Sequence, residues 1–204
     1  MKKLSLLLII AGVFFLGFGG YQLIKSHIDQ NKSLAEAKSL LEDSKDNAIS
    51  DKNSPTSEEP TFPSDYHPKT GEEIGILHIP KLESDLPIIE GTDEDELAKG
   101  VGHYKGTAFP LENDQIVLSG HRDTVFRRMG ELELGDILIV ELTYGEFSYE
   151  IVDTEIVDAD DRTVIVPTAP DEVLTVTTCY PFNFVGDAPE RYIITALPVE
   201  KNNE

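Results

Sequence analysis

Cysteine and basic residues are both scarce in this sequence, and each scarcity excludes a class of protein. Cys179 is the single cysteine among the 204 residues, so the chain cannot form an internal disulfide. Lysine and arginine total 17 against 38 aspartates and glutamates, which leaves a net charge of −21. Because phosphates would repel such a chain, no nucleic acid is expected as a partner. The length suits one ordinary domain with additional segments.

One long apolar run, residues 4–24, follows the two lysines Lys2 and Lys3. At about 1.5 Å per helical residue it would extend roughly 30 Å, the hydrocarbon thickness of a bilayer. A cleaved signal peptide is the alternative, but no A-x-A-like site follows the run. The run therefore predicts a transmembrane anchor, and the lysines favour a cytoplasmic N-terminus at residues 1–3. We expect a single-pass cell-membrane protein whose folded part is extracytoplasmic.

The next segment, residues 25–71, has the composition of a stalk. Its first part, 29–49, contains helix formers with few apolar residues, which is enough for a short helix. Its second part, 50–70, is rich in Ser, Pro, Asp, Glu and Lys. Such a composition cannot bury enough surface to fold alone. We expect a stalk that is partly helical and partly disordered.

A folded domain is predicted over residues 72–200, followed by a tail at 201–204. Short stretches rich in apolar and β-branched residues alternate with turn residues, and there is little helix. The predicted strands are 74–79, 86–89, 115–119, 137–142, 147–157, 173–178 and 192–197, with short helices at 92–99 and 125–132. This pattern is typical of an all-β protein, and it predicts a closed barrel with one or two short helices.

Cys179 lies where a predicted strand ends. The run from Val173 to Thr178 favours a strand, and Pro181 cannot continue a central one. The thiol is therefore expected at the mouth of a strand, where the chain turns. A reactive group suits that position, whereas a thiol that only packs lies more often in mid-strand.

A nucleophilic cysteine needs a proton-transfer partner and a donor for a developing oxyanion. Of the three domain histidines, His78 and His103 favour structural roles, whereas His121 follows a predicted strand and a glycine. Arg191 opens the last predicted strand, and a guanidinium can donate to a carbonyl or an oxyanion. A structural histidine and a surface arginine are the alternatives for these two residues.

These residues fall in three motifs that resemble the sortases, the cysteine transpeptidases of Gram-positive bacteria. The family's Thr-Leu-x-Thr-Cys motif looks like residues 175–179 here, with Val176 in place of leucine. The family histidine resembles His121 in LSGHRDTVF, and the family arginine resembles Arg191 in APERYIITAL. The motifs occur in the family's order and together cover the whole predicted domain. The resemblance implies an eight-stranded sortase barrel.

The resemblance also implies a reaction. The thiolate of Cys179 would attack the threonine carbonyl of an LPxT-type sorting signal, and His121 would transfer protons. Arg191 would hold the substrate carbonyl or the oxyanion, and Thr178 is a further substrate contact. The thioacyl intermediate would be resolved by a cell-wall amine. The implied partners are LPxT-motif surface proteins, peptidoglycan or its lipid-linked precursor, and the membrane through the anchor.

Within the family, class D sortases of spore-forming bacteria are the most similar, and class A is the next. The Asp-Pro-aromatic lid and C-terminal membrane segment of pilus-building sortases are not found. Pro167 and Pro170 interrupt the segment that would form the long helix of class B. The stretch YPFNFVGDAPERYI looks most like class D.

No cofactor is required on this interpretation, although calcium is a possibility. Two acidic loops could supply its oxygen ligands; they contain Glu112 and Asp114, and Asp158, Asp160 and Asp161. An acidic, solvated surface is the alternative, and neither loop has EF-hand spacing.

Two other function classes stay open. An L,D-transpeptidase would place Ser-His-Gly-Cys close together, whereas His121 and Cys179 are far apart here. A membrane-tethered, non-catalytic β-domain that binds a wall ligand would instead leave Cys179 buried and idle. Cleavage of an LPxT peptide separates these classes from a sortase.

Overall fold

The computed structural model describes residues 2–50, 60–184 and 186–199 of the chain. Residues 51–59 of the predicted stalk lie outside the described residues, as do the predicted tail at 201–204 and residue 200, the end of the predicted domain.

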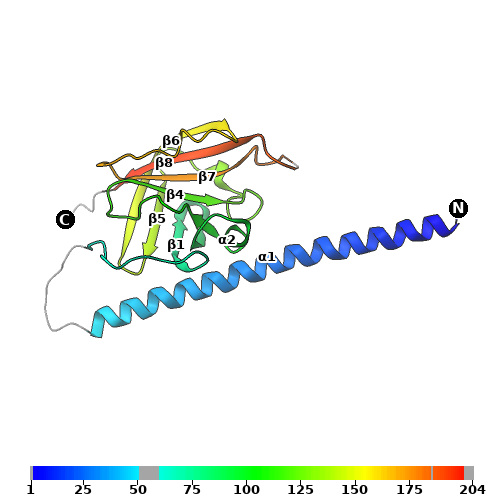
Figure 1. Cartoon of the computed structure of the whole chain (residues 1–204), viewed down its shortest axis with the longest axis horizontal. Coiled ribbons are helices and arrows are strands. Elements are labelled where there is room, and N and C mark those ends of the chain that lie inside the picture. The colour runs from blue at the N-terminus through cyan, green and yellow to red at the C-terminus, as the bar shows by residue number, and fades with distance from the viewer. Residues whose placement is uncertain (1, 51–59, 185, 200–204) are drawn as a thin grey trace.

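Eight strands form a closed barrel in the order β1-β2-β3-β4-β7-β8-β6-β5 (Figure 1). The strands are β1 (Glu73–Ile79), β2 (Ser84–Glu90), β3 (Val101–His103), β4 (Gln115–Gly120), β5 (Ile137–Leu142), β6 (Gly145–Asp158), β7 (Val173–Tyr180) and β8 (Glu190–Pro198). The predicted eight-stranded all-β barrel is confirmed. The three-residue strand β3 was not predicted, because so short a segment carries no periodic pattern.

Two parallel pairings set which strand ends meet. β4 pairs with β7 in parallel, so both strands end at the same rim of the barrel. β8 pairs with β7 antiparallel, so β8 begins at that rim. β2 and β3 form the other parallel pair, and the remaining neighbours are antiparallel.

The barrel interior holds the hydrophobic core. Its largest fully buried side chains include Tyr149, Phe126, Leu77, Ile116 and Leu138. Burial of this apolar surface is the main favourable term in folding.

The connections between the barrel strands contain little helix. The four-residue helix α2 (Glu94–Leu97) lies between β2 and β3, and two single 3-10 turns, η1 (Pro80–Leu82) and η2 (Met129–Glu131), follow β1 and precede β5. The helix predicted over 125–132 is reduced to η2, since the segment folds over the β4 end with its Phe126 in the core.

The N-terminal helix α1 (Lys2–Ser50) is continuous through the predicted anchor and the first part of the predicted stalk. A bilayer crossing needs about 20 consecutive apolar residues. Within the part of the chain that the structure describes, no helix meets the length and apolarity required to span a membrane. The predicted anchor at 4–24 is therefore not supported, and the single-pass localisation that depended on it is wrong.

The C-terminal half of α1 packs against the barrel, while its N-terminal half projects beyond it (Figure 1). Ala37 and Leu41 are 0% and 4% exposed, and they form a small apolar cluster with Ile76 of β1. Ser33 is also buried and donates a hydrogen bond to Glu73 over 3.0 Å.

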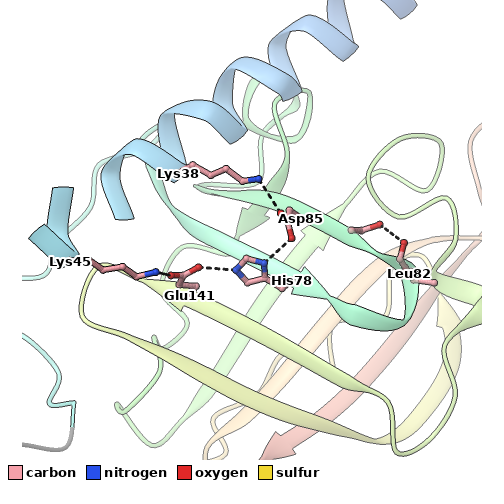
Figure 2. A network of polar contacts seen from close by, with 7 residues as sticks. Lys38, Lys45, His78, Leu82, Asp85 and Glu141 are labelled. Carbon is pink, nitrogen blue, oxygen red and sulfur yellow. Dashed lines mark hydrogen bonds and ion pairs between the residues drawn. The ribbon is translucent and has the colours of Figure 1, made fainter. Parts of the chain in front are cut away.

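A polar network joins α1 to β1, β2 and β5 (Figure 2). Lys38 and Lys45 of α1 reach Asp85 of β2 and Glu141 of β5 over 3.1 and 2.6 Å. The ring of His78 lies between the two carboxylates, 2.8 Å from Asp85 and 2.9 Å from Glu141. The hydrogen bond to His78 is the main cause that lowers the pKa of Asp85. Burial alone would raise the pKa of Glu141, but its contacts with Lys45 and His78 lower it overall.

The chain that enters β1 also packs on the barrel. The ring of Tyr66 lies edge-on to Phe109 and Tyr144, at 5.0 Å between centroids in both cases. Burial raises the pKa of the Tyr66 hydroxyl. A domain boundary near residue 72 stays a prediction, because 60–70 and α1 both contact the barrel.

Candidate active site

The strand register brings three of the predicted site residues to one rim. Cys179 of β7 is paired directly with Arg191 of β8. Thr178, just before the cysteine, is paired with Gly120, just before His121. Residues directly opposite in an antiparallel pair have Cα atoms about 4.5–5.5 Å apart, so the thiol and the guanidinium start from neighbouring backbones.

A cavity of about 460 Å³ opens at this rim, and Cys179, His121 and Arg191 all line it. Its remaining wall combines apolar and polar side chains from β4, β7, β8, α2, the segment after β3 and the loop after β6. These include Leu97, Val117, Val164, Ile165, Ile193, Tyr104, Thr178 and Arg162. The volume and mixed lining are those of a site for a short peptide segment or a small ligand.

Thr178 links the end of β7, which carries Cys179, to the end of β4, which His121 follows. Its hydroxyl donates to the carbonyl oxygen of Gly120 over 2.7 Å, and the side chain is 4% exposed. A hydroxyl has a single proton to donate, and this bond uses it. Thr178 therefore contributes to the site first by holding β4 and β7 in position, and a substrate contact stays a prediction.

Gly120 is required by close packing behind His121. A Cβ on this residue would lie 2.5 Å from ring carbons of Phe126, which is fully buried. The turn that follows is held by bonds from the amides of Thr124 and Phe126 to the carbonyl of His121. The histidine is thus placed by a rigid corner, and its side chain is half-buried.

Arg191 lies half-buried at the start of β8. Its Nη1 donates to the carbonyl oxygens of Ala188 and Glu190 over 3.2 and 2.9 Å. These bonds hold one terminal nitrogen of the guanidinium against the start of β8 and the loop before it. A guanidinium has five donors, so this anchoring is compatible with contacts to a bound carbonyl.

The loop between β6 and β7, which lines the cavity, is held by Gln115, which the sequence did not single out, and by Asp114, which the sequence offered only as a calcium ligand. Gln115 donates to the Val164 carbonyl over 2.7 Å, and its own side-chain oxygen accepts from the Val166 amide over 2.9 Å. Asp114 accepts hydrogen bonds from the amides of Thr168 and Ala169. Only the pairing of β4 with β7 places these residues beneath the loop, and no local signal identifies them.

The other histidines of the domain lie away from the cavity. His103 is 1% exposed, contacts Glu90 over 2.6 Å and stacks on Phe109. His78 belongs to the network with α1 (Figure 2). Both positions agree with the structural roles that the sequence favoured.

The acidic loops considered for calcium carry other interactions. Glu112 accepts from the Phe109 amide, and Asp161 accepts from the amide and hydroxyl of Thr163. Backbone hydrogen bonds, first from Gln115, lower the pKa of Asp114. Across the described ranges, no three His, Cys, Asp or Glu side chains are grouped so that they could hold a metal ion.

Comparison with known proteins shows the family of this chain. The family model described as the Sortase domain matches residues 77–199. This chain belongs to the sortase family. The sortase is 52% identical over 195 residues to Sortase D of Bacillus subtilis (strain 168), covering 95% of this chain and 97% of that protein.

Solved structures that are similar to this sortase include two Sortase D proteins. A Clostridium perfringens Sortase D5 transpeptidase superposes with a TM-score of 0.65 at 25% identity, over 84% of this chain and 99% of that one. The catalytic domain of Bacillus anthracis SrtD gives a TM-score of 0.56 at 41% identity, over 73% and 97% of the two chains. The predicted family, its likeness to class D and the assignment as a sortase transpeptidase are confirmed.

Proposed function

We propose that this sortase cleaves an LPxT-type sorting signal after its threonine and joins the released acyl group to a peptidoglycan amine. The observation that carries the proposal is the register, in which Cys179 faces Arg191 while His121 follows the residue paired with Thr178. Cys179, His121 and Arg191 line one cavity, which supports their proposed roles as nucleophile, proton carrier and permanent donor.

The proposed reaction has two halves. The Cys179 thiolate forms a bond to the threonine carbonyl carbon, and the scissile peptide bond breaks while His121 gives its proton to the leaving amine. An incoming amine then attacks the thioester and loses a proton to His121, and the carbon–sulfur bond breaks to restore the thiolate. Arg191 donates to the oxyanion in both tetrahedral intermediates. Its charge is permanent, so this stabilisation does not depend on proton transfer.

Incubation of the purified chain with an LPxT peptide and an amine tests the reaction. We expect the amide product, slower hydrolysis when the amine is omitted, and a thioacyl adduct that Cys179→Ala abolishes. His121→Ala and Arg191→Ala should each reduce turnover strongly without unfolding the domain. The exposed His67 and Arg127 offer matched controls, and His67→Ala and Arg127→Ala should leave turnover unchanged.

A specific experimental result would contradict each proposed role. Full activity in His121→Ala or Arg191→Ala removes that residue from its role. If the folded chain gives neither cleavage nor amide product and a thiol reagent leaves Cys179 unmodified, the non-catalytic alternative holds. A peptide library that varies the residue between proline and threonine and the residue after threonine defines the preferred sorting signal.

A further inference from the structure

Arg122, the residue after His121, has a buried guanidinium that the proposed reaction does not use. The side chain is 6% exposed and lies outside the set of residues that line the cavity. Its Nη1 donates to the carbonyl oxygen of Pro181 over 3.0 Å, and its Nη2 donates to that of Gly186 over 2.8 Å. The guanidinium carbon also lies 5.9 Å from the centre of the Phe184 ring.

Both carbonyls belong to the loop between β7 and β8. This loop leaves the barrel just after Cys179 and returns at Arg191. Arg122 is itself in the turn that follows His121. One guanidinium therefore connects the turn of the histidine with the loop that joins the cysteine to the arginine.

The chemistry of the bridge suits arginine and no other residue. The planar fork of a guanidinium offers two separate donors in fixed directions, whereas a lysine ammonium is a single point charge on a flexible stem. The acidic neighbour Asp123 lies 3.5 Å from Nε but is 72% exposed, so it balances the buried charge only in part. The two loop carbonyls thus supply the main short contacts of the guanidinium.

We infer that Arg122 is a positioning residue of the sortase reaction. By holding the β7–β8 loop against the histidine turn, it sets the distances among His121, Cys179 and Arg191. The inference rests on the proposed roles of those three residues. Arg122 itself touches neither the substrate nor the reacting atoms.

The test compares Arg122→Ala and Arg122→Lys with Arg127→Ala in the full chain. Arg127 lies in the same turn but is exposed and donates to the Asp123 carbonyl within that turn, so it is a matched control. A misplacement of about 1 Å can reduce a rate roughly 100-fold. We expect a kcat loss of roughly that size in Arg122→Ala, with KM for the LPxT peptide changed about threefold or less. Arg122→Lys should recover only part of the loss, because one ammonium cannot replace both arms of the fork.

Two further readouts separate positioning from stability. Added guanidinium ion at millimolar concentration should restore Arg122→Ala by roughly tenfold, because it can refill the vacated donor site, and should not affect Arg127→Ala. The pH profile of Cys179 alkylation should shift in Arg122→Ala and stay unchanged in Arg127→Ala. A displaced His121 changes the electrostatic environment of the thiol.

The outcomes are distinct. Unchanged kcat in folded Arg122→Ala, or full activity in Arg122→Lys, overturns the inference. An activity loss that matches only the unfolded fraction, with no rescue and no shift in the alkylation profile, also overturns it. If Arg122→Ala does not fold, Arg122→Lys keeps the charge and most of the volume, and its kcat decides. A wild-type chain that does not process any LPxT peptide refutes the proposed function instead, while the alkylation profiles still report on Arg122.

Discussion

Replacing Gly120 with alanine is expected to disable the site while the barrel stays folded. The added Cβ would lie 2.5 Å from two ring carbons of Phe126 and 2.8 Å from Cγ2 of Val125. Phe126 is fully buried and has no room to retreat. Overpacking by one methyl group typically costs about 1–3 kcal/mol of folding free energy. The alternative to that strain is a shift of the β4 end, which carries His121 with it.

The size of the kinetic effect follows from that shift. The clash must be relieved by a displacement of the order of 1 Å, and such a displacement at a catalytic group can lower the rate roughly 100-fold. The loss of about 1–3 kcal/mol is smaller than the total stability of about 5–15 kcal/mol of an ordinary domain, so the variant should still fold.

Two measurements check this prediction. Transpeptidation kinetics with an LPxT peptide give kcat/KM, and urea unfolding gives the free energy of unfolding. Phe126→Leu in the Gly120→Ala background vacates the clashing ring carbons, so it should restore kcat/KM by roughly tenfold through non-additive coupling of the two sites. A folded Gly120→Ala variant with wild-type kcat/KM would refute the reasoning, because it would show that His121 is not placed by this packing.

Three further predictions concern the α1 contact and the cavity wall. Leu41 is 4% exposed, so Leu41→Ala should weaken the docking of α1 by about 2–5 kcal/mol. Leu40 is 36% exposed, so Leu40→Ala should change the docking by about 0.5 kcal/mol or less. Hydrogen exchange of the α1 amides measures both changes, and equal effects would contradict the packing. The pKa values of Asp85 and Glu141 are lowered in the folded chain, so their contribution is present above the ordinary carboxylate pKa of about 4 and is lost as pH falls through the lowered values. The protection factors of the α1 amides, which are corrected for the intrinsic pH dependence of exchange, should therefore fall in acid, below about pH 4, and an identical profile in Glu141→Gln would count against this origin. Gln115→Leu removes the side-chain hydrogen bonds to the β6–β7 loop, so it should raise KM for the peptide roughly tenfold with a smaller change in kcat. An unchanged KM would show that this loop does not contribute to peptide binding.

The sequence was informative where the structure depends on neighbouring residues. The run from Val173 to Thr178 predicted a strand ending near Cys179, and β7 continues only to Tyr180. His121 was predicted just past a strand, and it directly follows β4. These predictions succeed because β-branched side chains favour extended backbone, and proline and glycine interrupt it, within a few residues.

Predictions about the surroundings of whole segments were less successful. The apolar run at 4–24 was interpreted as an anchor, a prediction that the structure does not support. The few apolar residues of 29–49 predict no more than a short helix, yet Ala37 and Leu41 are buried against Ile76. A segment's own composition does not reveal that a barrel face lies ready to cover a few of its side chains.

The sequence by itself determined seven of the eight barrel strands, the strand-end positions of the cysteine, histidine and arginine, and the sortase family through three ordered motifs. Only the tertiary structure decided that these ends share one rim, that Thr178 bonds to Gly120, and that Arg122 bridges the histidine turn and the β7–β8 loop. Those contacts join residues 58 to 64 positions apart. Local preference cannot specify such pairs, because they depend on which strands pair and in which register.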